Sequence, residues 1–456
     1  MPSPICLTQE IRRIEEQAAQ TTPPLMERAG KAAAKLAASL VSDERKDVVV
    51  LAGPGNNGGD ARIAAARLRE QFFRVSVVTR PEELPAAVRP SLVIDGLFGI
   101  GLARDIEGGY RRLVDYANAQ RCPVLAIDIP SGLDSDTGRV RGCAVRATHT
   151  LTFIALKPGL LTLDGPDHCG EISVADLGVQ TGGASAWVAE PDLFKAVLKP
   201  RPHNFHKGLA GSLAVFGGAA GMTGAALLAA RAALKLGAGR VYVGMLDQTM
   251  HVDPGAPELM LRHADDALGL DLDAMAVGPG LGTSERAETL VAAALASELP
   301  CVLDADALNL ISESEDLRKA CARRKSETLL TPHPAEAARL LGTTTAAVQE
   351  DRVKAARLLS QNLHAHVVLK GAGSICAARD GHWFINRTGH AGLSSAGTGD
   401  VLAGFLGSLL AQRYTGEAAL VLGVHLHGAA AEGLPQVGLT ASELIEPARR
   451  LWNSWL

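Results

Sequence analysis

Short runs of β-branched and aliphatic residues alternate with Ala-, Leu- and Arg-rich stretches along almost the whole chain. This alternation restricts the possible folds most strongly. In the first half, apolar runs at 48–52, 75–79, 92–95 and 124–128 are separated by segments of helical composition such as 61–72. Continuous apolar runs are typical of strands buried on both faces of a parallel sheet. Because strands that alternate with helices form βαβ units, we predict an α/β fold with helices on both faces of the sheet.

The length of the chain and a break in its pattern predict two domains. A chain of 456 residues exceeds what one hydrophobic core usually serves. The segment 187–208 is rich in proline and charge, and a second series of apolar runs begins after it. We therefore predict two α/β domains, 1–188 and 189–456. Further strands are expected at 148–155 and 170–178 in the first domain, and at 212–218, 240–244, 273–278, 300–308, 327–333 and 366–371 in the second.

Composition and charge narrow the cellular context. A net charge of −4 does not indicate a basic surface for nucleic acid. The sequence has no run of 18 apolar residues, so we expect no membrane-spanning helix. The seven cysteines form no CxxC pair and no cluster at zinc spacing, which indicates reduced thiols. The N-terminus lacks the apolar core of a secretion signal. We predict a cytoplasmic protein with small-molecule partners, and leave open whether it forms a homo-oligomer.

The run 48–52 leads into GPGNNGGD (53–60) and then into a helical stretch. Gly53, Gly55 and Gly58 match the G-x-G-x-x-G pattern in its strand–turn–helix context, which alone is a weak indication of dinucleotide binding. Asp60 would place a carboxylate at the helix N-terminus that this pattern reserves for a pyrophosphate. We therefore predict a loop that presents amides and a carboxylate to a ligand. A hydride-transfer enzyme is the alternative for this domain.

Acidic residues end two further strands of the first domain. Asp95 ends the run at 92–95, and Asp128 ends the run at 124–128 shortly before Ser131. Ligands of open α/β sheets bind at the carboxyl ends of the strands. Asn57, Asp95 and Ser131 are therefore predicted to converge and to offer oxygen ligands to a hard cation.

The motifs of the first half together resemble a known family. GPGNNGGD, DGLFGIGL, DIPSGLDSDTG and TLTFIALKPGLL, with MERAG at 26–30, are similar to the NAD(P)H-hydrate epimerases over nearly all of 1–180. The resemblance implies a Rossmann-like parallel α/β sandwich that interconverts the R and S hydrates at C6 of the nicotinamide ring. It implies a potassium ion held by Asn57, Asp95 and Ser131, and Asp128 as a catalytic residue. The implied hydrate-binding residues are Asn56, Asn57, Gly58, Gly59, Asp60, Gly99, Ile100, Gly101, Leu102, Ala103, Arg104, Asp105, Tyr110 and Asp128.

Two positions depart from the usual pattern of that family. Ala61 stands where the family usually has glycine, directly after Asp60. Ile100 stands where the family usually has threonine, so the presumed ligand loop lacks one hydroxyl.

The most informative motif of the second half is SAGTGD (395–400), which precedes an apolar helix. Gly397, Thr398 and Gly399 would leave backbone N–H groups open at the helix N-terminus, where they form a site for phosphate. Asp400 would then lie beside bound anions. A carboxylate is electrostatically costly there, so we interpret Asp400 as a catalytic base, with a helix cap as the alternative. A Walker A pattern is absent from the sequence, which disfavours a P-loop enzyme.

The GTGD turn resembles the ribokinase-like fold, and the surrounding motifs narrow this resemblance. HKGLAGSLAVFGG, VGPGLG, LDADALNL, LTPHPAEAARLL and VVLKGAGSI are together similar to the ADP-dependent NAD(P)H-hydrate dehydratases over about 200–445. The implied reaction begins when Asp400 takes the proton of the C6 hydroxyl of the S hydrate. The oxygen then attacks the β-phosphate of ADP, which gives AMP, and loss of phosphate yields NAD(P)H.

The same resemblance implies two sets of site residues, and magnesium is expected with the nucleotide. Hydrate binding is implied for Gly280, His333, Glu336 and Asp400. ADP binding is implied for Lys370, Gly371, Ala372, Gly373, Ser374, His390, Ser395, Ala396, Gly397, Thr398 and Gly399.

Two alternatives remain at this point. The second half could be a small-molecule kinase of the ribokinase-like superfamily, because GTGD alone does not exclude one. The first half could be a non-catalytic ligand-binding or protein-interaction module. The residues by themselves distinguish neither ADP from ATP nor NADH hydrate from NADPH hydrate.

Overall fold

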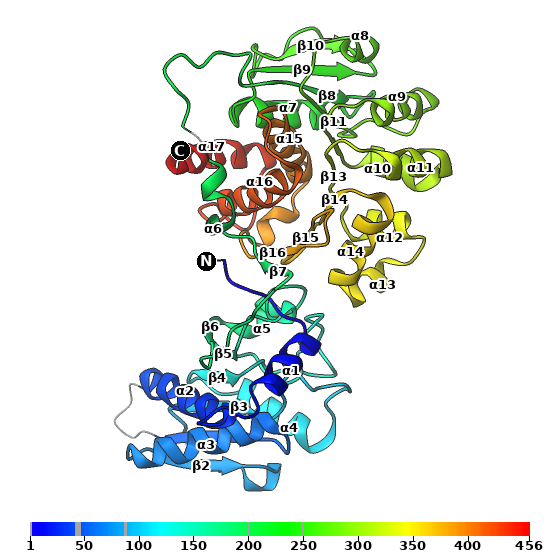
Figure 1. Ribbon diagram of the computed structural model, residues 1–456. Coiled ribbons are helices and arrows are strands. Elements are labelled where there is room, and N and C mark those ends of the chain that lie inside the picture. The colour runs from blue at the N-terminus through cyan, green and yellow to red at the C-terminus, as the bar shows by residue number, and fades with distance from the viewer. Residues whose placement is uncertain (1, 42–46, 86–88, 199, 249) are drawn as a thin grey trace. The chain divides into compact units, whose positions relative to one another are not determined.

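The computed structural model describes residues 2–41, 47–85, 89–198, 200–248 and 250–456 (Figure 1). The chain divides into two compact units: Ser3–Trp187 forms one, and Val188–Leu456 together with Pro2 forms the other. Whether the predicted domains 1–188 and 189–456 fold by themselves stays a prediction. Within the described ranges, no helix is long and apolar enough to cross a membrane.

The N-terminal unit contains a six-stranded parallel sheet with strand order β2-β1-β3-β4-β5-β6. This arrangement confirms the predicted parallel α/β fold. The elements are α1 (Thr8–Gln17), α2 (Leu25–Leu40), β1 (Asp47–Ala52), α3 (Asn56–Glu70), β2 (Arg74–Val78), β3 (Leu92–Gly96), α4 (Gly108–Asn118), β4 (Val124–Ile127), β5 (His149–Phe153), α5 (Gly165–Cys169) and β6 (Glu171–Ala175).

Burial within this sheet follows strand position. All residues of β3 and β4 are buried, because these strands lie inside the sheet and are covered on both faces. The run 75–79 was expected to be a buried strand as well, and this was wrong. β2 is an edge strand in which only Val78 is buried. Because β2 pairs only with β1, no strand covers its other edge, and Val75 and Val77 are only half-buried.

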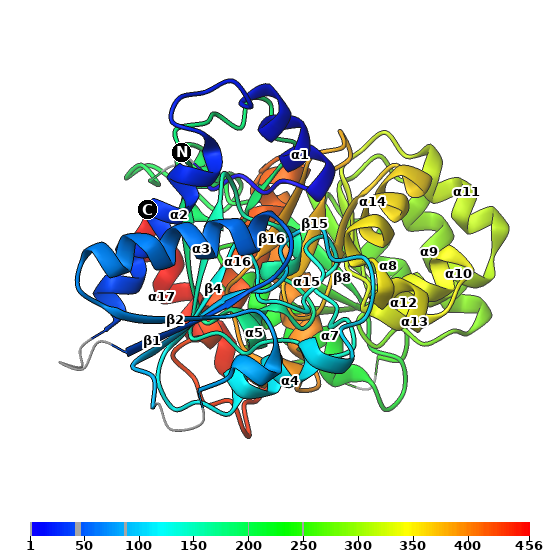
Figure 2. The same ribbon diagram turned by 90° about the horizontal axis from the view of Figure 1, so that it is seen from below.

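Helices α2 and α3 lie side by side and cover one face of the sheet (Figures 1 and 2). Their contact is close because small residues form it. Ala33 and Ala37 are fully buried, and a Cβ added at Gly30 would lie 2.4 Å from Cγ2 of Ile63. This packing fixes α3, whose N-terminus carries the GPGNNGGD loop, against the sheet.

The C-terminal unit contains a ten-stranded sheet with strand order β10-β9-β8-β11-β12-β13-β14-β15-β16-β7. The strands from β10 to β14 are parallel, whereas β15 is antiparallel to both β14 and β16. The strands are β7 (Ala186–Val188), β8 (Ser212–Gly217), β9 (Arg240–Met245), β10 (Met260–His263), β11 (Ala274–Val277), β12 (Cys301–Leu303), β13 (Thr328–Leu330), β14 (His366–Leu369), β15 (Ser374–Ala377) and β16 (Trp383–Asn386).

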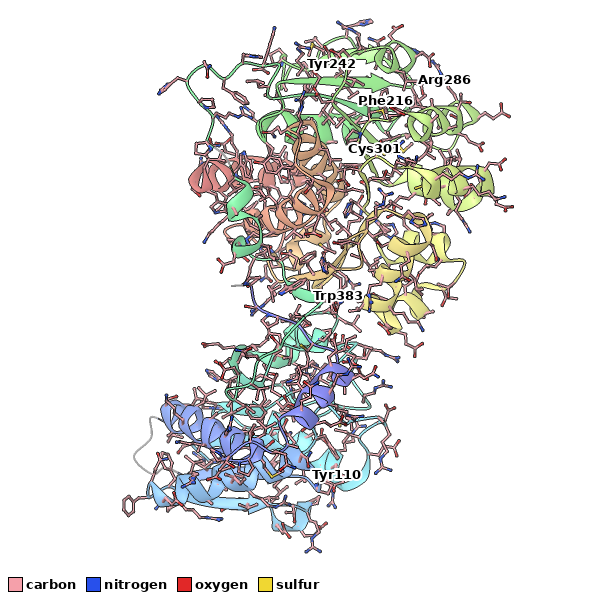
Figure 3. The ribbon with its side chains drawn as sticks, in the orientation of Figure 1. Tyr110, Phe216, Tyr242, Arg286, Cys301 and Trp383 are labelled. Atoms are coloured by element: carbon pink, nitrogen blue, oxygen red, sulfur yellow. The ribbon has the colours of Figure 1, made fainter. Side chains whose placement is uncertain are left out.

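Helices cover both faces of this sheet, with α15 and α16 on one side and α10 to α12 on the other (Figure 1). The core side chains Phe216, Cys301 and Trp383 come from β8, β12 and β16 and are buried (Figure 3). The helices are α6 (Pro191–Phe194), α7 (Thr223–Lys235), α8 (Ala264–Leu268), α9 (Glu285–Ala296), α10 (Asp306–Glu313), α11 (Glu315–Arg323), α12 (Pro334–Leu341), α13 (Thr345–Glu350), α14 (Arg352–Leu363), α15 (Thr398–Ala411), α16 (Gly416–Ala431) and α17 (Ile445–Trp455).

All seven cysteines are free thiols, and five of them are buried. Cys6 and Cys169 belong to the N-terminal unit, whereas Cys301, Cys321 and Cys376 belong to the C-terminal unit. Burial raises the pKa of Cys6 to about 11 and that of Cys321 to about 12. Few of these thiols are therefore ionised at neutral pH.

Candidate active sites

The loop between β1 and α3 requires glycine for steric reasons. A Cβ at Gly53 would lie 1.8 Å from the Leu97 carbonyl oxygen, and one at Gly58 would lie 2.0 Å from the Gly53 carbonyl oxygen. The close backbone approach lets the first turns of α3 sit against the end of β3. As a result, Asn57 and Asp60 are both buried, at 7% and 8% exposure.

Asn57, Asp95 and Ser131 lie around the segment that follows β3. Both terminal atoms of the Asn57 amide are buried and have no hydrogen-bond partner among the described residues. The fully buried Asp95 carboxylate accepts hydrogen bonds from the Ser131 hydroxyl at 2.6 Å and from the Ser131 N–H at 2.8 Å. Burial raises the pKa of Asp95 to about 6, although these hydrogen bonds oppose the shift. A buried amide without a partner and a buried carboxylate both offer oxygen atoms of the kind that coordinate hard cations, and their predicted convergence on one ion stays a prediction.

Asp128 follows β4, and it lies close enough to Asp60 for its charge to affect the pKa of Asp60. A Cβ built at Gly99 would lie 3.5 Å from Oδ2 of Asp128 and 3.4 Å from Cγ of Asn57, so these residues converge. Burial, followed by the negative charges of Asp128 and Glu15, raises the pKa of Asp60 to about 8. The site therefore combines two carboxyl groups in different surroundings, a pattern that favours acid–base chemistry.

The predicted residues of the loop 99–110 lie in different surroundings. Ile100 packs against the apolar core cluster between the sheet and helices α2 and α3, so its methyl groups replace the missing hydroxyl with a hydrophobic contact. Tyr110, labelled in Figure 3, packs edge-on against Phe98 with ring centroids 4.8 Å apart. Ala103, Arg104 and Asp105 are exposed. Their predicted role in hydrate binding stays a prediction.

Residues that the sequence analysis did not single out also reach this site. Arg12 and Glu15 come from α1, and an added Cβ at Gly101 would lie 3.7 Å from Nη2 of Arg12. Burial and the charge of Asp128 raise the pKa of Glu15. Lys157 is fully buried and forms an ion pair with Asp128. The only sequence signal for Lys157 is a lone lysine at the end of the apolar run in TLTFIALKPGLL.

The second site is built around the N-terminus of α15. Gly397 precedes this helix with φ of +87°, a conformation that favours glycine. The Thr398 hydroxyl donates to the carbonyl groups of Leu393 and Ser395, and the Thr398 carbonyl accepts a hydrogen bond from Nε2 of His427. Burial lowers the pKa of His427 to about 4, so the ring is neutral. The side chain of Thr398 thus fixes the turn. Binding of phosphate by the backbone N–H groups of this turn stays a prediction.

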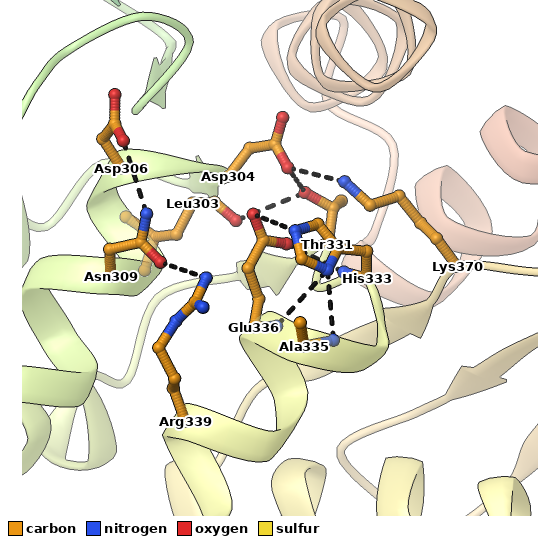
Figure 4. Close-up of polar contacts among 10 residues, drawn as sticks. All are labelled: Leu303, Asp304, Asp306, Asn309, Thr331, His333, Ala335, Glu336, Arg339 and Lys370. Atoms are coloured by element: carbon orange, nitrogen blue, oxygen red, sulfur yellow. Dashed lines mark hydrogen bonds and ion pairs between the residues drawn. The ribbon is translucent and has the colours of Figure 1, made fainter. Parts of the chain in front are cut away.

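Lys370 and Asp304 approach this turn from the ends of β14 and β12 (Figure 4). The Lys370 ammonium lies 3.1 Å from Oδ1 of Asp304, and the same oxygen accepts a hydrogen bond from Thr331 at 2.6 Å. A Cβ at Gly399 would lie 3.2 Å from Nζ of Lys370. Lys370 therefore lies close to the GTGD turn, and its predicted contact with ADP stays a prediction. Its partner, Asp304, was not assigned in the sequence analysis.

Asp400 lies in the first turn of α15 among charged groups. Burial, followed by the charge of Asp304, raises its pKa to about 6, while Lys370 opposes and Asp306 adds to the shift. Asp304 and Asp306 flank Ala305, which has φ of +48° and ψ of −116°. Strained non-glycine residues of this kind concentrate at functional sites.

His333 and Glu336 form a capping box at the start of α12 (Figure 4). Oε2 of Glu336 accepts a hydrogen bond from the His333 N–H at 2.8 Å, and Oε1 lies 3.2 Å from Nε2 of His333. Burial would raise the pKa of Glu336, but the His333 hydrogen bond and the charge of Lys370 hold it below its usual value. The imidazole is 47% exposed, so it keeps access to a ligand.

The remaining predicted residues have partly structural environments. Gly280 and Gly371 have φ of +59° and +142°. A Cβ at Gly371 would collide with the guanidinium of the buried Arg352. This guanidinium also donates to the carbonyl of Lys370 at the start of the 370–374 loop. Nε2 of His390 donates to the Ala431 carbonyl at 2.7 Å, which ties this residue to the end of α16. Ser395 and Ala396 lie in the connection to α15.

Each half of the chain matches a known protein family. The family described as NAD(P)H-hydrate dehydratase matches residues 213–447, and the one described as YjeF-related protein N-terminus matches residues 23–89 and 81–159. The bifunctional NAD(P)H-hydrate repair enzyme of Escherichia coli is 36% identical and covers 99% of this chain and 95% of its own length. The chain belongs to the bifunctional NAD(P)H-hydrate repair enzyme family. It is thus an enzyme with an N-terminal epimerase domain and a C-terminal dehydratase domain.

Other proteins are similar to the C-terminal half of the chain alone. An ADP-dependent (S)-NAD(P)H-hydrate dehydratase of Neisseria meningitidis is 47% identical over 57% of this chain and 91% of its own length. The structure of an ADP/ATP-dependent NAD(P)H-hydrate dehydratase of Bacillus subtilis, co-crystallised with ATP and Mg²⁺, is 29% identical with a TM-score of 0.52. It covers 59% of this chain and 98% of its own. These findings confirm the ribokinase-like fold and favour repair over a small-molecule kinase with a non-catalytic module.

Proposed function

We propose that this chain exchanges the R and S NAD(P)H hydrates at the Asp128 site. The Asp400 site then dehydrates the S hydrate with conversion of ADP to AMP and phosphate. The observation that carries the proposal is that each half places the carboxylate of a predicted catalytic residue close to a lysine. Asp128 forms an ion pair with the buried Lys157, and the charge of the half-buried Lys370 lowers the pKa of Asp400. Bifunctional relatives match the whole chain, so one polypeptide would clear both epimers.

In the dehydratase reaction, the chain's own groups orient the reactants and move one proton. Asp400 accepts the proton of the C6 hydroxyl as that oxygen attacks the β-phosphate of ADP. Lys370 and the backbone N–H groups of Gly397 to Gly399 hold the phosphates and stabilise the charge that develops on them. AMP leaves first. Departure of phosphate from C6 with a proton from C5 then restores the dihydronicotinamide ring.

In the epimerase reaction, the C6–O bond must break and form again on the other face of the ring. The C6 hydroxyl leaves as water when its oxygen receives a proton, because the lone pair of N1 stabilises C6 as an iminium. Water then adds to the opposite face and gives up a proton, so one group must donate this proton and take it back. Asp128 is the candidate, because its free oxygen faces Gly99 and the hydrate-binding loop. Asn56 to Asp60, the 99–105 loop and Tyr110 would hold the substrate. Positioning of this kind supplies much of the rate gain when the reacting group is already aligned.

Two metal ions fit the residues that the chain presents. Potassium would be held by the unpartnered Asn57 amide oxygen, the Asp95 carboxylate and the Ser131 hydroxyl, and it would balance the buried charge of Asp95. Magnesium would be held by the carboxylates near Asp400 and would neutralise phosphate charge. The Bacillus subtilis relative was co-crystallised with ATP and Mg²⁺. We further propose that the enzyme acts in the cytoplasm, and we leave its oligomeric state to measurement.

The potassium site is tested by the Asp95→Ala variant. We expect exchange to fall and added potassium not to restore it, because the site loses its only carboxylate. Asp47→Ala is the control, since Asp47 begins β1 at the opposite end of the sheet. Wild-type exchange with an unchanged potassium response in Asp95→Ala would remove Asp95 from the site.

The overall function is tested with the purified chain and a mixture of NADH hydrates. We expect ADP to restore NADH absorbance completely, and without nucleotide we expect only the epimer ratio to relax. Parallel reactions with ATP decide the nucleotide preference. Transfer of phosphate to a small alcohol without NADH formation would instead indicate a kinase.

A further inference from the structure

The backbone at Asp128 adopts a conformation that the sequence would not favour. Asp128 has φ of +66°, and the N–H of Ile129 bonds to the carbonyl of Ile127 at 2.9 Å, which closes a tight three-residue turn. Such turns with positive φ are rare and strained for residues other than glycine. Because the turn directly follows β4, it points the Asp128 side chain across the end of the sheet.

The neighbouring strand ends in the same way. Ile154 follows β5 with φ of +69°, and the N–H of Ala155 bonds to the carbonyl of Phe153 at 2.8 Å. The strands β4 and β5 are parallel neighbours, so the two strained turns lie side by side. Two such turns at adjacent strand ends need a feature that holds both.

The ammonium group of Lys157 is that feature. It donates to Oδ1 of Asp128, to the Thr152 hydroxyl at 2.8 Å and to the Phe153 carbonyl at 2.8 Å. These three bonds use all three ammonium protons. The side chain is completely buried, and the ion pair therefore joins the turn after β4 to the strand that leads into the turn after β5.

Stability alone does not explain a buried ion pair. Replacing such a pair with apolar residues of similar volume is often neutral or stabilising, because two charges lose their hydration. The contacts of Lys157 do have a directional consequence. They commit Oδ1 of Asp128 and leave Oδ2, which would lie 3.5 Å from a Cβ at Gly99, toward the hydrate-binding loop.

We propose that Lys157 is a positioning residue for epimer exchange: it holds one carboxylate oxygen of Asp128 so that the other faces the C6 hydroxyl of the hydrate. This inference rests on the function proposed above for Asp128. Lys157 itself does not touch the substrate, so its removal should affect the rate of the bound complex and leave substrate affinity nearly unchanged.

The test uses the full chain without nucleotide and follows conversion of the purified S hydrate to R. Lys157→Met should lower kcat by about 10- to 10²-fold with KM changed less than about 3-fold, as expected for a displaced reacting group. Lys157→Arg should recover part of the loss. Arg74→Met removes an ion pair at the opposite end of the same sheet and should exchange like the wild type. Dehydration of the S hydrate with ADP reports that the rest of the chain is intact.

The double variant Lys157→Met/Asp128→Asn keeps the test valid if the single lysine variant folds poorly, because it removes both buried charges. We expect its exchange rate to equal that of Asp128→Asn, since Lys157 acts through Asp128. A double variant much slower than Asp128→Asn, or a folded Lys157→Met with wild-type kcat, would overturn the role of Lys157 alone. Wild-type exchange by Asp128→Asn would instead overturn the function proposed for Asp128.

Discussion

The surroundings of Asp400 determine what this carboxylate can do. The charges that act on its pKa are those of the Asp304 and Asp306 carboxylates and of the Lys370 ammonium. Burial and the two neighbouring acids make its ionised form less favourable, whereas Lys370 prevents a larger shift. The result is a pKa of about 6, which lies closer to neutral pH than that of an ordinary aspartate and suits a general base.

Asp400→Asn should retain nucleotide binding and lower dehydration by at least about 10²-fold, the low end for a positioned base. The amide is of similar size but accepts no proton. Absorbance of NADH measures dehydration, and calorimetry with ADP measures binding. Epimer exchange is the internal control and should be unchanged. A variant that dehydrates at a near-normal rate would exclude Asp400 as the base.

The same group should make activity and stability respond to pH in opposite directions. Dehydration should rise as pH increases through about 6, because the base must be ionised. Since the folded-state pKa is raised, the contribution of Asp400 to stability is fully present below the unfolded pKa of about 4. It is lost as pH rises through about 6.

Asp400→Asn should therefore unfold at a higher temperature than the wild type at pH 7 to 8, by the equivalent of roughly 1 to 3 kcal/mol. The difference should vanish near pH 4. Thermal unfolding at the two pH values checks this. An equal difference at both would mean that the shift of Asp400 has no effect on stability.

At the scale of elements, the α3 N-terminus depends on a glycine that permits close backbone contact. A Cβ at Gly58 would lie 2.0 Å from the Gly53 carbonyl oxygen, so Gly58→Ala must displace the turn that carries Asn57 and Asp60. We expect epimer exchange to fall by at least about 10-fold, since small misplacements are costly. Gly55→Ala is the matched control, because φ is −91° there and nothing lies within 4 Å of the added atom. Equal exchange in both variants would refute the steric argument.

The sequence predicted the elements whose signals are local. The parallel strands were predicted from continuous apolar runs. The GPGNNGGD loop and the GTGD turn were predicted from short glycine-rich motifs. Strands β7, β10, β15 and β16 were missed, although strands as short as β11 and β12 were predicted. Their sequences, AWV, MLRH, SICA and WFIN, do not form the continuous aliphatic and β-branched runs on which the prediction relied.

The missed site residues have partners that only the tertiary fold brings close. Lys157 and Asp128 are 29 residues apart, and Lys370 and Asp304 are 66 residues apart. In the sequence, each of these residues only marks the end of a strand or a position in a loop. A short motif shows neither which residue it contacts in the fold nor whether its side chain is buried.

At the scale of the whole molecule, each unit contains its own sheet, core and candidate site. Because β7 (Ala186–Val188) belongs to the C-terminal sheet, separating the chain just before Ala186 should give two folded proteins. The C-terminal piece should consume only the S hydrate with ADP and stall while R remains, apart from slow spontaneous exchange. Adding the N-terminal piece should release the stalled fraction. If the C-terminal piece is insoluble, the domain boundary lies elsewhere. If it consumes both epimers rapidly by itself, the dehydratase does not need the epimerase, and the functional explanation for the fusion is wrong.

The buried thiols give each half of the enzyme a built-in label. A thiol-reactive reagent can modify Cys6 or Cys169 only when the N-terminal unit opens, and Cys301, Cys321 or Cys376 only when the C-terminal unit opens. Mass spectrometry of peptides after pulsed alkylation would thus time the opening of each half in the intact chain. Addition of ADP should slow modification of the second set and leave the first unchanged, so that ligand binding is recorded without any engineered probe.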